Sequence, residues 1–199
     1  MKRVAVFASG RGSNLVALLA AQSIYRSYQI VLVVSNILTS GAIELARAAQ
    51  VEAIVIPSRG RPRDEHERLL LQALLERDVD CLCLAGYMRI LGPDFIGGFA
   101  GPILNVHPSL LPAFPGMHAQ KQAVEAGVRW SGATIHFVDT GVDSGPVVLQ
   151  EPIGVEDSDT EESLAVRILA LEHALYPKAL DIVARRAYDL RGRRVHLTG

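Results

Sequence analysis

Two polar residues in the middle of the chain have the types and the spacing that carbonyl chemistry needs. Asn105 and His107 end an apolar run that predicts a short strand, and residues 108–116 then contain three prolines and a glycine. Residues two apart on a strand point to the same side. An amide can stabilise a developing oxyanion, and an imidazole can move a proton near neutral pH. The alternative interpretation is a turn-forming Asn beside a structural His.

Asp143 is a third candidate, in a segment rich in turn formers that covers residues 139–146. A carboxylate beside His107 would favour the charged imidazole, raise its pKa and help to move a proton. The alternative is an ordinary Asx turn. Whether the two side chains meet depends on the fold.

A glycine-rich segment near the N-terminus predicts an anion site. It consists of Gly10, Arg11, Gly12, Ser13 and Asn14, between a predicted strand and a predicted helix. Glycines let backbone N–H groups approach a phosphate, and a helix N-terminus adds a favourable dipole. The spacing matches neither a dinucleotide-binding fingerprint nor a Walker loop. A tight turn that needs glycine only for its geometry is the alternative.

Residues 86–91 follow the fourth predicted strand and include Met88, Arg89, Ile90 and Leu91. This mixture of thioether, cation and aliphatic groups could line the pocket of a flat heterocycle. Simple core packing is the alternative. Glu172, in a long predicted helix, is by default a solvated surface charge.

Strand and helix patterns alternate through the first half of the chain. Short apolar runs predict strands at residues 4–8, 30–34, 53–56, 81–85 and 103–106. Ser13 or Asn14 is expected to cap the first helix. Asp64 is expected to cap a later helix whose inward face carries the leucines Leu70, Leu71, Leu74 and Leu75. The pattern predicts an α/β fold with a mostly parallel twisted sheet and helices on both faces. The candidate residues then lie at the carboxyl ends of strands, where such sheets bind ligands.

The second half of the chain predicts an antiparallel extension of the sheet. Residues 131–138 and 147–153 are strand-like and follow a short helix at residues 119–126. A long helix comes next, with Asp159 and Glu162 at capping-box spacing and Pro177 as a kink or a new start. The tail from Ala187 predicts a hairpin. Without repeats or linkers, one domain over residues 1–199 is expected.

Composition limits the class of protein. The chain has 199 residues, 49% of them hydrophobic, and a net charge of −1, which favours a globular protein without a nucleic-acid footprint. Cys81 and Cys83 are too far apart on one strand for a relaxed disulfide and suggest a reducing, cytoplasmic setting. The histidines lack the spacing of a helical zinc motif, so no metal is expected. No signal peptide or membrane span is expected either.

Motifs along nearly the whole chain resemble the folate-dependent formyltransferases, and most narrowly the phosphoribosylglycinamide (GAR) formyltransferases. They are Ser9-Gly-Arg-Gly-Ser-Asn-Leu15, Ala85-Gly-Tyr-Met-Arg-Ile-Leu91, Asn105-Val-His-Pro-Ser-Leu-Leu-Pro112, Phe114-Pro-Gly116, Ile135-His-Phe-Val-Asp139, Val142-Asp-Ser-Gly-Pro146 and Glu172-His-Ala-Leu-Tyr-Pro177. The Asn-x-His-Pro block resembles a block that all these enzymes share. The glycine loop and the Glu172 segment resemble segments of the purine enzyme.

The resemblance implies transfer of a formyl group from 10-formyltetrahydrofolate, as co-substrate, to the amine of glycinamide ribonucleotide in purine biosynthesis. It implies that Asn105 and a protonated His107 stabilise the oxyanion and that Asp143 assists proton transfer. It further implies that the glycine loop binds the ribonucleotide phosphate and that Glu172 binds its ribose. The folate would be bound by Met88, Arg89, Ile90 and Leu91 together with Asn105, and its tail by Arg63. Arg59 and Arg61 compete for that last role.

Three other functions remain as alternatives. A Met-tRNA formyltransferase resembles the chain through the Asn-x-His block, but is expected to carry an additional basic domain. A hydrolase of the formyl donor and a non-catalytic nucleotide- or folate-binding protein are the others. We expect small-molecule substrates, no nucleic acid and no membrane as partners. A monomer and a homodimer both fit the sequence.

Overall fold

The computed structural model describes residues 1–198 and divides into two compact units. The first is Met1–Leu104 and the second begins at Asn105, so the division falls within strand β5 (Ile103–His107). Gly199, the last residue of the expected domain, lies outside the described residues. The expectation of one domain stays a prediction.

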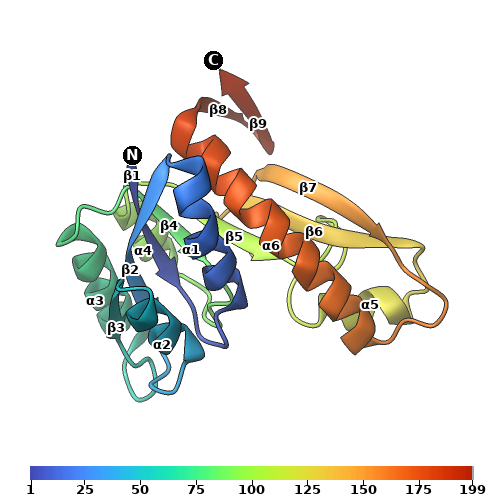
Figure 1. Ribbon diagram of the computed structural model, residues 1–199, viewed down its shortest axis with the longest axis horizontal. Coiled ribbons are helices and arrows are strands. Elements are labelled where there is room, and N and C mark those ends of the chain that lie inside the picture. Colours follow the sequence, from blue (N-terminus) through green and yellow to red (C-terminus); the bar gives the residue numbers. More distant parts are fainter. Residues whose placement is uncertain (199) are drawn as a thin grey trace. The chain divides into compact units, whose positions relative to one another are not determined.

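The first unit is built on a parallel sheet. Its strands are β1 (Lys2–Phe7), β2 (Tyr28–Ser35), β3 (Glu52–Val55) and β4 (Cys81–Leu84), in the order β3-β2-β1-β4, and each pairs in parallel with its neighbours (Figure 1). The helices are α1 (Ser13–Tyr25), α2 (Gly41–Ala48), α3 (Arg63–Leu75) and the short α4 (Pro93–Gly98), which the sequence did not predict. Cys81 and Cys83 are buried and free in β4.

The strand order reverses beside β1. The chain runs outward from β1 to β2 and β3, and then returns to the other side of β1 to form β4. Right-handed crossovers therefore put α1 and α2 on one face and α3 on the other. In agreement, α1 packs against α2, and α3 packs against α4. The segments that follow β1 and β4 lie at this switch point, where open α/β sheets bind ligands.

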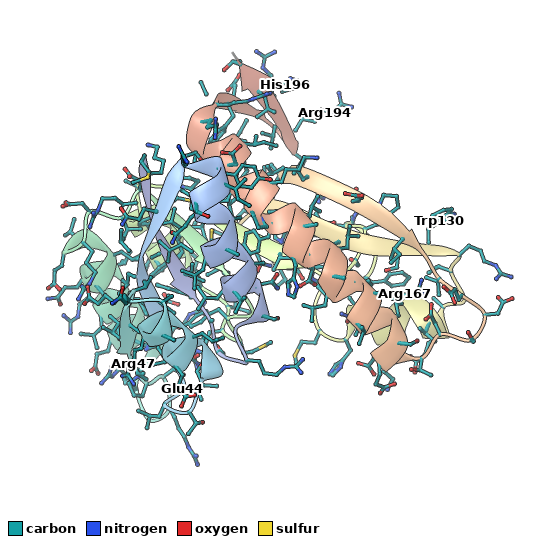
Figure 2. The ribbon with its side chains drawn as sticks, viewed as in Figure 1. Glu44, Arg47, Trp130, Arg167, Arg194 and His196 are labelled. Atoms are coloured by element: carbon teal, nitrogen blue, oxygen red, sulfur yellow. The ribbon has the colours of Figure 1, made fainter. Side chains whose placement is uncertain are left out.

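The second unit is mainly antiparallel. After α5 (Ala119–Glu125), β6 (Trp130–Phe137) pairs with β7 (Val147–Gly154), and α6 (Glu161–Arg185) packs against both strands (Figure 1). The chain then forms the hairpin of β8 (Ala187–Arg191) and β9 (Arg194–Thr198), with Arg194 and His196 on β9 (Figure 2). The predicted α/β class, with a mostly parallel sheet and antiparallel strands at the end, is confirmed. Within residues 1–198, no helix has the length and apolarity that a membrane span requires.

The predicted helix starts are wrong by one or two residues. Helix α1 begins after Gly12, whose φ of 84° suits glycine, and neither Ser13 nor Asn14 caps it. Helix α3 begins after Pro62, which places Asp64 in its first turn. In each case the backbone enters the helix from a turn whose geometry is set by glycine or proline, before a polar side chain can cap it.

Helix α6 has a capping box that the sequence placed one residue too early. The Thr160 hydroxyl accepts from the Ser163 N–H, and the Ser163 hydroxyl accepts from the Thr160 N–H at 2.9 Å. Asp159 instead accepts from the Ser163 hydroxyl and the Glu156 N–H. The helix then runs through Pro177 without a break.

The buried face of α3 differs from the predicted one. Leu70 and Leu74 are buried, but Leu75 is 79% exposed. His66 and Glu67 are buried instead, at 2% and 7% exposure. Residues 66, 70 and 74 form one row at four-residue spacing, so a buried histidine continues the leucine row toward the start of the helix.

This difference in burial predicts that substitutions of two neighbouring leucines have unequal effects on stability. Leu74→Ala should lower the free energy of unfolding by about 2–5 kcal/mol, because it leaves a cavity in the core. Leu75→Ala should change it by less than about 0.5 kcal/mol, as expected for an exposed side chain. Urea denaturation of both variants measures the difference. Equal losses would mean that α3 packs with the other face inward.

Candidate functional site

In the second unit, the Asp143 carboxylate contacts both of the residues that first suggested carbonyl chemistry. One oxygen, Oδ2, lies 3.2 Å from His107 Nδ1, and the other, Oδ1, lies 3.5 Å from Asn105 Nδ2. Asn105 and His107 are at the end of β5, and Asp143 lies in the loop between β6 and β7. Residues from two separate segments of the sequence thus form one cluster. His107 is 4% exposed, so the cluster is largely shielded from water.

The loop that carries Asp143 is held by its own hydrogen bonds. Asp139 accepts from the Gly141 N–H at 3.0 Å and from the Ser144 hydroxyl at 2.7 Å. A Cβ on Gly145 would lie 1.8 Å from the Phe137 carbonyl oxygen, so only glycine fits there. Asp143 itself has a φ of 50°. These constraints turn its carboxylate toward β5 and away from solvent.

Both ring nitrogens of His107 face hydrogen-bond acceptors. Nε2 lies 2.8 Å from the Phe114 carbonyl oxygen, and Nδ1 faces Asp143. A carbonyl oxygen can only accept, so Nε2 carries a hydrogen. Nδ1 then bonds to the carboxylate only if it is protonated too. The geometry therefore favours an imidazolium paired with a carboxylate.

Burial opposes this charged form. It lowers the pKa of His107 below its ordinary value, although the Phe114 carbonyl and the Asp143 charge both raise it. Asp143 was expected to raise this pKa, and it does contribute in that direction, but desolvation is the larger effect.

The Asp143 carboxyl is shifted toward its ionised form. Burial raises its pKa, but its contacts with His136, the hydrogen bond from the Gly116 N–H and the charge of His107 lower it below its ordinary value. The Gly116 N–H donates to Oδ2 at 2.8 Å. An ionised carboxylate therefore lies next to His107 at neutral pH.

His136 is a member of this cluster that sequence reasoning missed. It lies on β6, and its Nδ1 donates to the Phe137 carbonyl oxygen at 2.8 Å. In the neutral ring, Nε2 is then an acceptor, and it lies 3.2 Å from Asn105 Nδ2. His136 thus orients the Asn105 amide. From the sequence, His136 was assessed only as a possible metal ligand. Its place in the Ile135–Asp139 motif was the one signal of a role in the site.

The glycine-rich loop lies between β1 and α1 in the first unit. No side chain caps the N-terminus of α1. A Cβ on Gly12 would lie 2.9 Å from Ala42 Cα, so the loop packs closely on α2. The Ser40 hydroxyl donates to the Gly10 carbonyl oxygen at 3.0 Å, and Arg11 is exposed. The uncapped helix start and the glycine backbone provide what an anion site needs.

The segment after β4 presents apolar groups to solvent. Met88 is 71% exposed and Ile90 is 66% exposed, whereas Leu91 is buried and Arg89 is half-buried. Arg63 reaches this segment, because its Nη2 donates to the Ile90 carbonyl oxygen at 2.9 Å while its Nε donates to Glu67 at the same distance. A cavity of about 400 Å³ lies beside Arg63, between α3 and α4. Of the three competing arginines, Arg63 is thus the one bonded to this segment.

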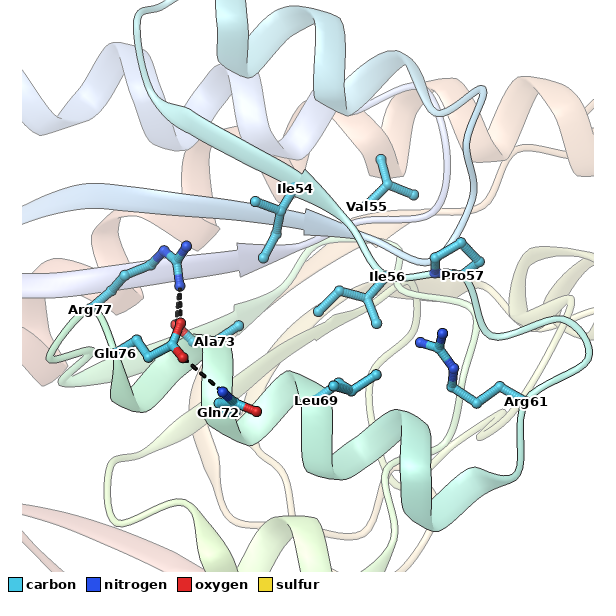
Figure 3. Close-up of a pocket in the computed structure, with 10 residues that line it drawn as sticks. All are labelled: Ile54, Val55, Ile56, Pro57, Arg61, Leu69, Gln72, Ala73, Glu76 and Arg77. Atoms are coloured by element: carbon cyan, nitrogen blue, oxygen red, sulfur yellow. Dashed lines mark hydrogen bonds and ion pairs between the residues drawn. The ribbon is translucent and has the colours of Figure 1, made fainter.

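Another cavity, of about 360 Å³, lies between β3 and α3 (Figure 3). Arg61 lies at one end, and at the other end Arg77 is paired with Glu76 (Figure 3). Arg77 is also paired with Glu52. Among the described residues, Arg61, a competing candidate for the folate tail, lines this cavity, and none of the other predicted site residues does.

Glu172 lies on α6 in the second unit. It is only 7% exposed, so its interpretation as a solvated charge is wrong. Buried carboxylates are seldom kept without a structural or binding role. Among residues 1–198, no group of three or more His, Cys, Asp and Glu side chains could hold a metal ion.

Comparisons with known proteins agree on one family. A formyl transferase family model matches residues 2–180. The chain is 44% identical over 194 residues to the trifunctional purine biosynthetic protein adenosine-3 of Drosophila pseudoobscura pseudoobscura, a match that covers 94% of the chain but 14% of that protein. It is 38% identical to the phosphoribosylglycinamide formyltransferase of Bacillus subtilis, covering 90% of the chain and 93% of that protein.

A solved structure is similar over the full length. Glycinamide ribonucleotide transformylase 1 from Symbiobacterium toebii superposes with a TM-score of 0.96 at 42% identity, covering 100% of this chain and 95% of that one. With a family model over most of the sequence and relatives of this similarity, the chain belongs to the formyl transferase family.

Proposed function

We propose that this chain is a phosphoribosylglycinamide formyltransferase. It transfers the formyl group of 10-formyltetrahydrofolate to the amine of glycinamide ribonucleotide, giving formylglycinamide ribonucleotide and tetrahydrofolate in purine biosynthesis. The observation that carries the proposal is the single carboxylate of Asp143 in contact with both Asn105 and His107, in a chain of the formyl transferase family.

The amine of the ribonucleotide attacks the formyl carbon directly, and negative charge develops on the formyl oxygen. The Asn105 N–H that points to Asp143 is the donor for this oxygen, because its 3.5 Å contact is at the limit of a hydrogen bond. Its other N–H stays with His136. Protonated His107 adds positive charge beside the same oxygen. Donors already fixed in a shielded site stabilise such charge at little reorganisation cost.

The proton balance needs one group that takes a proton and one that gives a proton. The attacking amine loses a proton, and the departing folate nitrogen gains one. Asp143 and His107 share a hydrogen-bonded contact and can carry out this exchange, with water as the carrier to the substrates. The depressed pKa of Asp143 supports a carboxylate that is ionised at the start of each cycle.

The remaining predicted residues bind the substrates. The loop of Gly10, Arg11, Gly12, Ser13 and Asn14 holds the ribonucleotide phosphate, and Glu172 contacts the ribose. The exposed segment from Met88 to Leu91 borders the pterin, and Arg63 meets the folate tail. The absence of a metal, the absence of nucleic-acid and membrane partners, a cytoplasmic location and the choice between monomer and homodimer stay predictions from the sequence.

Absorbance-monitored turnover of 10-formyltetrahydrofolate, with and without glycinamide ribonucleotide, tests the proposal. Turnover that requires the ribonucleotide supports the transferase. Formate release that does not depend on it would identify a hydrolase. Formyl transfer to Met-tRNA would identify a Met-tRNA formyltransferase. Folate binding without any turnover would identify a non-catalytic binding protein. Either result would contradict the proposal.

Replacing His107 should abolish most of the activity. His107→Ala is expected to lower kcat by about 10²- to 10⁴-fold, the range for loss of a proton-transferring group. His196→Ala, which changes a histidine on β9, is the matched control and should keep wild-type kcat. Steady-state kinetics and circular dichroism of both variants check activity and folding. Full activity of a folded His107→Ala enzyme would remove the proposed mechanism.

Asp143→Asn should change the pH dependence. The ionised carboxylate raises the His107 pKa, so its removal lowers that pKa further. Because His107 acts in its protonated form, the basic limb of the kcat/KM profile should move to lower pH. An NMR titration of His107 measures the same shift directly. A limb that stays in place, or moves to higher pH, would show that Asp143 does not support the charged ring.

Arg63→Ala should weaken folate binding. Loss of one charge-assisted contact to a carboxylate is worth roughly tenfold in KM for 10-formyltetrahydrofolate, with kcat nearly unchanged. Arg59→Ala, which changes an exposed arginine in the same segment, is the control and should leave KM within about twofold. The opposite ranking would assign the folate tail to Arg59.

A further inference from the structure

Ser9 joins the two proposed substrate-binding segments of the first unit. It immediately precedes Gly10, the first residue of the phosphate loop, and is only 6% exposed. Its N–H donates to the Gly86 carbonyl oxygen at 3.1 Å, and its hydroxyl accepts from the Met88 N–H at 2.9 Å. These bonds cross the switch point between β1 and β4, where the strand order reverses.

The bonding continues to the ends of the next two strands. The Ser9 hydroxyl donates to Asn36 Oδ1 at 2.6 Å, and Asn36 Nδ2 donates to the Ser58 hydroxyl at 3.1 Å. Asn36 follows β2, and Ser58 begins the arginine-rich segment after β3. A chain of hydrogen bonds thus links the carboxyl ends of four parallel strands. We call it the rim chain (Met88 N–H, Ser9, Asn36 and Ser58).

The Ser9 hydroxyl acts both as a donor and as an acceptor within the rim chain. It donates once and accepts once, and burial leaves it little access to water or ligand. Buried hydrogen-bond networks of this kind restrain their members together. Ser9 therefore fixes the backbone of Met88 relative to Gly10 without touching a substrate itself.

We infer that Ser9 is a positioning residue that couples the ribonucleotide-phosphate loop to the pterin-binding segment, so that each substrate favours binding of the other. The inference rests on the proposed function, since that function assigns ligands to the two segments. An anion that restrains Gly10 further also restrains Ser9 further, and the Ser9 hydroxyl passes this restraint to Met88. Such coupling is reciprocal by thermodynamic necessity.

The test is a binding cycle with two ligands that cannot react with each other. Calorimetry measures the Kd of 5,8-dideazafolate, which lacks a formyl group, with and without saturating glycinamide ribonucleotide. In the wild-type protein the ribonucleotide should tighten folate binding by about 5-fold or more, the lower end of typical coupling. In Ser9→Ala this ratio should fall to nearly one, and in Ser9→Thr, which keeps the hydroxyl, it should recover.

Controls separate coupling from general damage. Ser23→Ala changes an exposed serine of α1 whose hydroxyl donates to the Ala20 carbonyl oxygen of the same helix, and it should keep the wild-type ratio. Urea midpoints are measured for every variant. If Ser9→Ala does not fold, Asn36→Ala removes the acceptor of the Ser9 hydroxyl and should lower the ratio while the Met88 bond remains.

The outcomes distinguish this inference from the proposed function. Wild-type protein that binds neither ligand contradicts the proposed function and the coupling with it. Wild-type protein that binds both ligands independently overturns the coupling alone. A folded Ser9→Ala variant with the wild-type ratio also overturns it, because the two segments would then communicate without Ser9.

Discussion

The site depends on the compensation of one buried charge. The Asp143 carboxylate is largely removed from water, and a carboxylate in that position is costly unless it is paired and hydrogen-bonded. Its two oxygens meet His107, the Gly116 N–H and the Asn105 amide. Each of these groups is oriented by the need to satisfy that charge. The same interaction that stabilises the carboxylate therefore positions the amide and the imidazole for chemistry.

In the first unit, polar contacts from α3 hold the segment after β4 in position. His66 Nε2 lies 2.9 Å from the Tyr87 hydroxyl, and Glu67 accepts from the Gly92 N–H at 2.8 Å. With Arg63 bonded to the Ile90 carbonyl, three side chains of one helix hold successive points of the segment. This explains why α3 buries polar residues where the sequence suggested only leucines. Exposed Met88 and Ile90 thus project from a backbone that is fixed on the side of α3.

Local patterns were sufficient for much of this structure. Apolar runs and glycine or proline breaks predicted the strands, and the parallel alternation followed from them. Asn105 and His107 were identified because residues two apart on a strand share one side. Asp143 was a candidate because it is a carboxylate in a turn-rich segment, and the fold brings it within 3.2 Å of His107.

The wrong or missing predictions share one physical cause, which is contact between residues far apart in the sequence. Leu75 is exposed and His66 is buried because packing of the whole unit, not leucine content, decides which face of α3 turns inward. The role of His136 depends on Asn105 across two strands, and no local pattern contains that pairing. The net pKa of His107 reflects how deeply the fold buries the ring, which the identity of its carboxylate neighbour does not reveal.

The central claim is that one carboxylate orients both catalytic side chains. A crystal structure of Asp143→Ala tests it most directly. We expect β5 and β6 to keep their backbone positions while the Asn105 amide and the His107 ring lose their single orientations, because their shared acceptor is gone. Side chains that remain in place, with the wild-type hydrogen bonds to His136 and Phe114 unchanged, would show that these two partners suffice and that Asp143 does not organise the site.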